Sequence, residues 1–285
     1  MRFQFIYDHE SDFEVTMMCQ TFDVSRSGYY AWKSRPVSDT RQRAESLTAE
    51  IQEIHHKRKQ VYGSPRVHQE LLDRGYEACV NTVAKYMRNA GLRSKTKKKF
   101  IATTNSKHDR PVANNVLNRE FASPTKPHQV WLSDITYIWT DQGWMYLAVV
   151  LDLFTRKVVG WSADKSMTSQ LVVDAMQKAI DREQPSGNVM CHSDRGSQYA
   201  SEAYQKLLKE NGFTCSMSRK GNCWDNAPME SFFASLKKEL IHHERYDSPV
   251  AARRSLFEYI EAFYNTIRKH SALDYQSPAQ FQQTT

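Results

Sequence analysis

Three acidic residues have the chemistry and sequence settings expected of ligands for hard divalent cations. Asp134 lies inside the β-branched and aromatic run 131–137, Asp194 follows the apolar run 189–191, and Glu230 stands near the start of an expected helix. A charge within such a run is unfavourable unless it faces a ligand. Because carboxylate oxygens without imidazole or thiolate partners suit Mg²⁺ or Mn²⁺ better than zinc, the three residues predict a site for those ions.

Paired ions at these residues would support phosphodiester chemistry. Three carboxylates within a few ångströms cannot all stay ionised without cations between them. Two metal ions about 4 Å apart would neutralise them, activate an attacking oxygen and stabilise the leaving oxygen of an in-line displacement. Lys237 follows Glu230 by two helical turns, so it shares that face and is expected to contact a DNA phosphate. Simpler interpretations remain open: such carboxylates are common as helix caps and ion-pair partners, and such a lysine often faces solvent.

An alternation of helical and extended patterns is expected to position these residues. Strands are expected at 130–140, 144–153, 157–163, 189–191 and 213–217, and helices at 167–181, 201–211, from about 228, and 249–270. Three strands followed by alternating helices and strands predict an α/β fold with a mixed sheet flanked by helices. Asp225 or Asn226 is expected to cap the Glu230 helix. His192 is a further candidate ligand or base, although a hydrogen-bonded histidine at the sheet edge is favoured. Asp152 could be a ligand, but a structural partner of Arg156 is favoured.

The long last helix, 249–270, is expected to be amphipathic. Its expected inward residues are Leu256, Tyr259, Ile260, Phe263 and Ile267. Because its end is aromatic and basic, we expect Arg268 to contact DNA.

The excess positive charge is confined to the N-terminal part of the chain. Residues 1–110 hold 20 Lys and Arg against 13 Asp and Glu, whereas residues 111–285 hold 19 of each. Helical pairs at 13–34 and 46–92 have helix-turn-helix proportions, although the first is equally compatible with an ordinary helical hairpin. Expected caps in these pairs are Ser25, Ser64 and Asn81. The basic residues expected to contact DNA phosphates are Lys85, Arg88, Arg93, Lys95, Lys97, Lys98 and Lys99.

These patterns divide the chain into five segments. They are a helix-turn-helix-like segment (1–45), a second such domain with a basic tail (46–101), a linker (102–125), a catalytic core (126–242) and a helical extension (243–285). The five scattered cysteines form no Cys-x-x-Cys pair and favour reduced thiols in a cytoplasmic protein. No apolar run approaches 18 residues, so no membrane span is expected.

Several motifs together resemble the transposases encoded by the second reading frame (OrfB) of two-frame bacterial insertion sequences. They are Trp131-x-x-Asp134-Ile135-Thr136-Tyr137, Leu151-Asp152-x-x-x-Arg156, His192-Ser193-Asp194-x-Gly196, Asp225-Asn226-x-x-x-Glu230-Ser231-Phe232-Phe233, Tyr62-Gly63-x-Pro65-Arg66-Val67 and Tyr264-Asn265-x-x-Arg268-x-His270. The resemblance covers nearly the whole chain. It implies an RNase H-like core similar to retroviral integrase, with the Asp, Asp, Glu triad at Asp134, Asp194 and Glu230 and the family's basic residue at Lys237.

The resemblance also implies an activity and partners. The expected activity is nicking of the element's end to free a 3′-OH, followed by strand transfer, with two Mg²⁺ or Mn²⁺ ions per site. Expected partners are element and target DNA, further copies of the chain, and the first-frame (OrfA) product as a partner or fusion. The expected location is the bacterial cytoplasm, on the nucleoid. Two alternatives stay open: an RNase H-like nuclease that cuts RNA–DNA hybrids, and a catalytically silent DNA-binding regulator.

Overall fold

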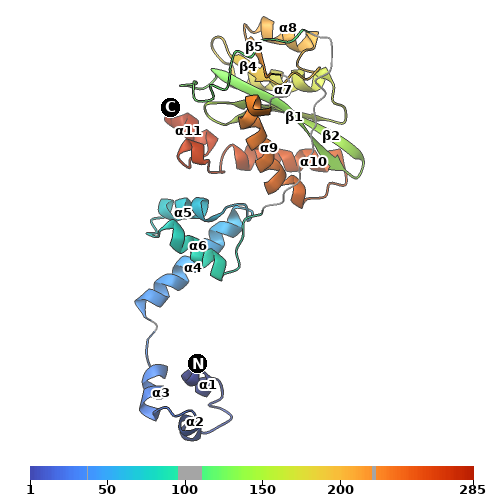
Figure 1. Ribbon diagram of the computed structural model, residues 1–285. Helices are drawn as coiled ribbons and strands as arrows, with labels where there is room; N and C mark the ends of the chain where they lie inside the picture. The colour runs from blue at the N-terminus through green and yellow to red at the C-terminus, as the bar shows by residue number, and fades with distance from the viewer. Residues whose placement is uncertain (37, 96–110, 220–222) are drawn as a thin grey trace.

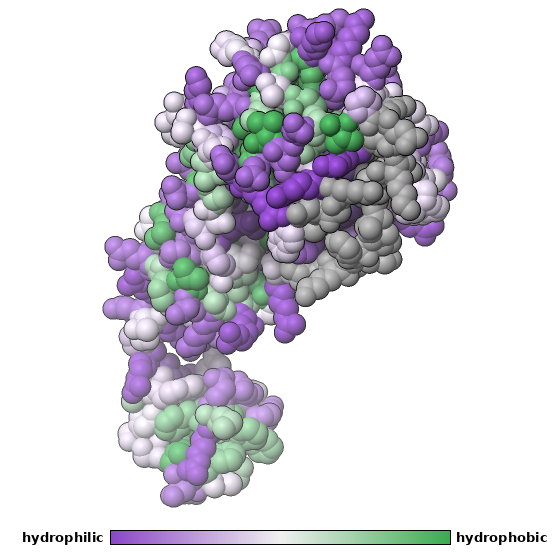
Figure 2. Space-filling model, turned by 45° about the horizontal axis from the view of Figure 1, so that its top comes forward, coloured by the Kyte–Doolittle hydropathy of each residue, from purple (hydrophilic) through white to green (hydrophobic). Residues whose placement is uncertain are grey.

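The computed structural model describes residues 1–36, 38–95, 111–219 and 223–285. The N-terminal unit contains helices α1 (Arg2–Asp8), α2 (Val15–Thr21) and α3 (Arg26–Lys33). As expected, Ser25 caps α3: its hydroxyl accepts a hydrogen bond from the Gly28 amide at 3.0 Å. The unit lies apart from the rest of the molecule (Figure 1). Hydrophobic side chains reach its surface (Figure 2), with Phe13 and Met17 about half exposed.

The second helical unit contains α4 (Asp39–Lys57), α5 (Ser64–Asp73) and α6 (Val80–Asn89). Its interior is built from aliphatic side chains of all three helices, namely Ile51, Ile54, Val67, Leu71 and Val83. Two expected caps are wrong. Gly63 and Cys79 occupy the capping positions in extended conformation, so Ser64 and Asn81 each lie inside the first turn. Pro65 fits that first turn because its missing N–H would have no helical partner there.

A mixed five-stranded sheet forms the centre of the remaining chain. Its strands are β1 (Val130–Thr140), β2 (Gly143–Asp152), β3 (Val158–Asp164), β4 (Met190–Ser193) and β5 (Thr214–Met217), in the order β3-β2-β1-β4-β5. The first three strands pair antiparallel, whereas β4 pairs parallel with both β1 and β5. Together with the flanking helices this is the predicted RNase H-like class of fold.

Helices cover both faces of the sheet because side chains alternate along β1. Leu132 and Ile138 pack on the face that also buries α9 (Ala227–Glu239) and α10 (Pro249–Phe257). Trp131 and Ile135 point to the opposite face, which is covered by α7 (Ser169–Glu183) and α8 (Glu202–Glu210). Figure 1 shows α9 crossing in front of β1. Within the described residues, no helix is long and apolar enough to cross a membrane.

The C-terminal extension differs from the single helix expected at 249–270. After α10 the chain forms a π-helical segment η3 (Glu258–Tyr264), in which the Asn265 amide bonds to the Ile260 carbonyl five residues earlier. The helical conformation ends at Tyr264, so Ile267, expected to face inward from a continuous helix, lies in the following turn and is exposed. The remaining elements are η1 (Cys223–Asn226), η2 (Ile241–His243), η4 (Ser271–Leu273) and α11 (Pro278–Thr284).

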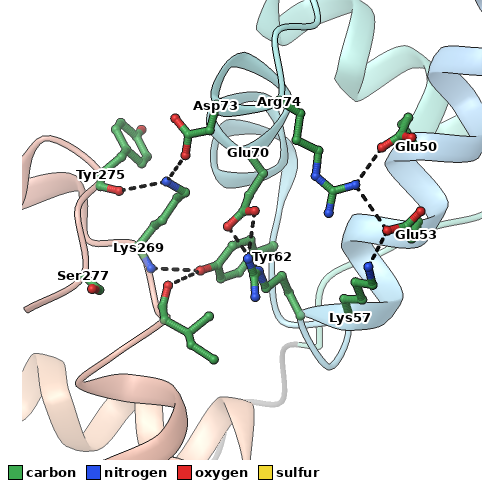
Figure 3. Close-up of polar contacts among 12 residues, drawn as sticks. Glu50, Glu53, Lys57, Tyr62, Glu70, Asp73, Arg74, Lys269, Tyr275 and Ser277 are labelled. Atoms are coloured by element: carbon green, nitrogen blue, oxygen red, sulfur yellow. Dashed lines mark hydrogen bonds and ion pairs between the residues drawn. The ribbon is translucent and has the colours of Figure 1, made fainter. Parts of the chain in front are cut away.

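Polar contacts fix the second helical unit to the segment after η3 (Figure 3). The Tyr62 hydroxyl accepts from the Lys269 amide at 2.8 Å and donates to the Ile267 carbonyl at 3.2 Å. The Lys269 ammonium pairs with Asp73 at 2.5 Å, and Arg66 donates to the Lys269 carbonyl at 2.9 Å. Residues about 200 positions apart in the chain therefore hold the two parts together.

Candidate active site

The parallel pairing of β1 and β4 brings Asp134 and Asp194 together. The last paired residues of these strands are Ser133 and Ser193, and each aspartate is the next residue along its strand. Asp134 accepts a hydrogen bond from the Ile135 amide at 2.8 Å, and Asp194 accepts one from the Gly196 amide at 2.8 Å. The two side chains are partly buried. They therefore occupy neighbouring positions on rigid elements, where the β1–β4 ladder ends.

Helix α9 carries Glu230 to the same place. The helix packs on β1 through Met229, Phe232 and Phe233, which are all buried. Asn226 precedes the helix and its amide donates to the Ser133 carbonyl at 3.4 Å, which ties the start of α9 to the end of the β1–β4 ladder. Asn226 occupies the N-cap position of α9, as one of the two expected caps, but its side chain makes no capping hydrogen bond. Glu230, in the first turn, is exposed to solvent.

The charges of the three carboxylates act on one another. Burial raises the pKa of Asp134, the negative charge of Asp194 raises it further, and that of Glu230 adds a smaller effect in the same direction. The Ile135 amide and Lys237 oppose this rise. Burial also raises the pKa of Glu230. The site therefore concentrates negative charge that a cation would relieve.

The donor set fits a hard divalent cation, because all three groups supply carboxylate oxygens. Among the residues that the structure describes, no three His, Cys, Asp or Glu side chains stand close enough together to form a ready metal site. Glu230 is exposed on a helix surface, where side-chain rotamers interchange rapidly. Closure of the three groups on an ion would therefore involve a change of the Glu230 side-chain rotamer.

Lys237 lies on the same face of α9 as Glu230. Its ammonium stands 5.0 Å from the centroid of the Tyr137 ring. Burial lowers the pKa of Lys237, and the nearby charge of Asp134 partly offsets the effect. The side chain is partly buried beside the carboxylates, so the simple solvent-facing alternative is wrong. The contact with Tyr137 was not expected, because Tyr137 and Asp134 alternate to opposite faces of β1.

Asp225 organises the loop before α9. It is fully buried and accepts hydrogen bonds from Arg219 and Arg119, each at 2.7 Å, and from Asn115 at 2.9 Å. The hydrogen bonds from the Arg219 guanidinium are the largest cause that holds the pKa of Asp225 well below its usual range. Asp225 thus joins residues more than 100 positions apart, and its role here is structural.

Two other polar residues near the strands differ from expectation. His192 is not at the sheet edge: it is fully buried, with Nδ1 2.9 Å from the Ser216 hydroxyl, and burial lowers its pKa to about 4. Asp152 is structural as expected, but its carboxylate takes hydrogen bonds from the amides of His128 and Thr155 at 2.7 and 2.8 Å, and it acts on Arg156 through its charge, which partly offsets the effect of burial on the Arg156 pKa. Since neutral His192 is enclosed, it offers no exposed base to the site.

The basic residues expected to contact DNA fall into two groups. Lys85, Arg88 and Arg93 are exposed, and Lys95 is partly exposed. Lys97, Lys98 and Lys99 lie outside the described residues.

The expectation that Arg268 contacts DNA is wrong. Its guanidinium is buried and donates to Glu239 at 2.7 and 2.9 Å and to the Ser235 hydroxyl at 3.2 Å. Burial alone would lower the pKa of Arg268, but the hydrogen bonds and charge of Glu239 outweigh burial and raise it. Arg268 therefore joins the C-terminal segment to α9, a pairing across 29 residues that helical periodicity could not indicate.

Three family models match the chain. A model described as an HTH-like domain matches residues 42–100, and two models described as integrase core domains match residues 124–223 and 211–278. The described strands β1 to β5 and helix α9 lie within the two integrase-core matches.

Relatives match over nearly the full length. The chain is 43% identical over 284 residues to the transposase InsF for insertion sequence IS3A of Escherichia coli K12, covering 99% of this chain and 98% of that protein. It is 44% identical over 266 residues to the 31 kDa protein of insertion element IS600 of Shigella sonnei, covering 93% and 97%.

Solved structures of viral integrases also match. The HTLV-2 integrase catalytic core domain in complex with magnesium has 18% identity, a TM-score of 0.43, and coverage of 55% of this chain and 98% of that one. The simian T-cell lymphotropic virus intasome in complex with the PP2A regulatory subunit B56 gamma has 15% identity, a TM-score of 0.47, and coverage of 82% and 74%.

Proposed function

This chain belongs to the family of insertion-sequence transposases that includes InsF of IS3, and on that premise we propose that it nicks the ends of a DNA element and joins the freed 3′-OH to another phosphodiester. The observation that supports the proposal is that Asp134 and Asp194 follow the last paired residues of neighbouring strands β1 and β4, with Glu230 near enough for its charge to raise the pKa of Asp134. The general function, DNA transposition through an integrase core, follows from family membership.

Each residue of the site has a distinct task in this proposal. Asp134, Asp194 and Glu230 would hold two Mg²⁺ or Mn²⁺ ions, which when bound supply activation of the attacking oxygen and stabilisation of the leaving one. Lys237 binds a phosphate beside the scissile bond, since its ammonium reaches the same edge of β1. The Asp225 and Asn226 contacts hold the start of α9, and with it Glu230, against β1.

The proposal assigns DNA binding outside the site to the helical units. Lys85 and Arg88 on α6, with Arg93 and Lys95 after it, present positive charge on the segment that matches the HTH-like model. Such residues bind phosphates and add affinity that falls steeply with salt. Assembly of several copies on DNA, and partnership with the first-frame product, also belong to the proposal.

The experiment uses labelled duplexes that carry the terminal sequence of the chain's own element, with Mg²⁺ or Mn²⁺. We expect Asp134→Asn, Asp194→Asn and Glu230→Gln each to reduce nicking and joining at least 100-fold, by loss of transition-state stabilisation. DNA binding by gel retardation should remain, because the helical units are unchanged.

Asp181→Asn serves as the matched control, because it removes an exposed carboxylate from α7 on the opposite face of the sheet. Normal joining by any one of the three site variants would remove that residue from the site. If the chain cleaved RNA–DNA hybrids and left the DNA ends intact, it would be an RNase H-like nuclease and the proposed nicking and joining would be wrong.

A further inference from the structure

The end of the β1–β2 hairpin carries an exposed row of aromatic rings. Trp139 pairs across the strands with Trp144, and Tyr137 pairs with Tyr146. The Trp139 and Trp144 ring centroids are 4.9 Å apart, those of Tyr137 and Trp144 are 5.0 Å apart, and both pairs meet edge to face. We call Tyr137, Trp139, Trp144 and Tyr146 the hairpin aromatic face.

The described helices leave this face partly uncovered. The core that contains α7 lies on the same side of the sheet and includes Ala148 and Val150 of β2, and Tyr146 packs against it, whereas Trp139 and Trp144 lie outside this core. Trp139 is 56% exposed and Trp144 46% exposed, although neighbouring Ile138 and Met145 on the opposite side are buried. Exposed clustered tryptophans are costly in water unless they meet a partner.

Lys237 connects this face to the candidate active site, although Tyr137 and Asp134 point to opposite faces of β1. Strand β4 pairs with β1 only as far as Ser133, so beyond that residue β4 does not cover the edge of β1. Lys237 reaches this edge from α9 and places its ammonium over the Tyr137 ring. One lysine therefore lies between the carboxylates and the aromatic rings, so a phosphate bound by Lys237 would bring the adjoining nucleotide to Tyr137.

We propose that the hairpin aromatic face is a stacking platform for unpaired bases of the DNA strand held at the candidate active site. Aromatic rings beside a cation are the arrangement that binds single-stranded DNA without reading its sequence, since every base has a face that can stack. The inference rests on the proposed function, because that function brings DNA to Asp134 and Lys237.

The strand geometry gives the reach of the platform. Tyr137 and Trp139 lie three and five residues beyond Asp134 on β1, or about 10 and 17 Å away at about 3.3 Å per residue. At the rise of about 3.4 Å per nucleotide of B-DNA, this corresponds to about three to five nucleotides from the scissile phosphate. The platform would thus serve unpaired bases that lie a few nucleotides from the scissile phosphate.

The test measures binding of a fluorescent 12-nucleotide thymidine oligonucleotide to the full chain without divalent metal. We expect Trp144→Ala, and more strongly Trp139→Ala with Trp144→Ala, to weaken binding roughly five- to 100-fold. Trp144→Phe should keep most of the affinity, whereas Trp144→Leu should lose it, because leucine is apolar but has no ring. An oligonucleotide of the same length with abasic sugars should bind the unmodified chain as weakly as thymidine binds the double variant.

Phe257→Ala is the matched control, since Phe257 is 55% exposed on α10, which packs on the opposite face of the sheet. Equal binding by Trp144→Leu and Trp144→Phe would overturn the proposal. So would a change of oligomeric state in the alanine variants with unchanged oligonucleotide binding, which would assign the face to contact between copies. Because the readout needs no catalysis, failure of nicking in the site variants would leave this test unaffected.

Discussion

The Lys237 ammonium interacts with two different groups. It is attracted by the charge of the Asp134 carboxylate, and it lies over the ring of Tyr137. Its position two turns after Glu230 indicated the first contact. The second contact depends on where β4 stops pairing, because only an uncovered strand edge lets a helix residue reach the opposite face. Sequence spacing could therefore place Lys237 near the site but could not identify its aromatic partner.

Replacement of Lys237 by alanine should weaken binding of the element's end roughly tenfold, as expected for loss of one charge-assisted hydrogen bond. The slope of log affinity against log salt should fall by about one, the value for one phosphate contact. Lys238→Ala is the matched control, because Lys238 is the next residue on α9 and is exposed. If both variants bind the end equally well, Lys237 has no special role. Retardation assays across a salt series give the measurement.

The elements around the site depend on a close approach that a single glycine allows. Gly160 in β3 faces α7, and an added Cβ would overlap the Ala175 carbonyl oxygen and lie 2.7 Å from the Ala179 nitrogen. Both are backbone atoms, so side-chain rearrangement cannot relieve the overlap. The α7 helix must therefore move away from the sheet if Gly160 gains a side chain.

Gly160→Ala should lower the free energy of unfolding by about 1–3 kcal/mol, the usual cost of overpacking. Gly63→Ala provides the comparison, because its added carbon would meet only atoms 3.9 Å away. Its cost should stay below about 1 kcal/mol, as for a changed capping residue. Urea unfolding of both variants measures the difference. Equal stability of Gly160→Ala and the unmodified chain would mean that α7 shifts without cost.

The sheet elements were predictable, because short apolar runs, several of them rich in β-branched and aromatic residues, mark the strands and because turn residues bound several of them. The strand expected at 130–140 is observed over those residues, and the other strands agree within a few positions. The form of the C-terminal helix was not predictable from the sequence. No residue type distinguishes the π-helical segment from an ordinary α-helix, so the pattern predicted one continuous helix. The buried partners of Asp225 were also inaccessible to pattern reasoning, since Arg119 lies 106 residues before it.

At the scale of the whole molecule, the second helical unit and the catalytic core share one buried apolar cluster, and polar contacts around Lys269 join them as well. Tyr62 is fully buried there, and its hydroxyl satisfies both the Lys269 amide and the Ile267 carbonyl. Asp73 of the same unit pairs with the Lys269 ammonium (Figure 3). Arg66 of that unit donates to the Lys269 carbonyl. Because Arg268, the neighbour of Lys269, pairs with Glu239 of α9, the contact continues towards the helix that carries Glu230.

Tyr62→Phe should therefore loosen this junction while leaving each part folded. The ring remains to fill its place, but a buried amide and a buried carbonyl lose their partner, at a cost of about 1–3 kcal/mol. Amide hydrogen exchange at Ile267 and Lys269 should accelerate, whereas exchange in β1 and β2 should not change. Tyr86→Phe on α6 is the matched control, since that partly buried tyrosine is in the same unit. Equal exchange at Lys269 in the two variants would show that the Tyr62 hydroxyl does not hold the junction.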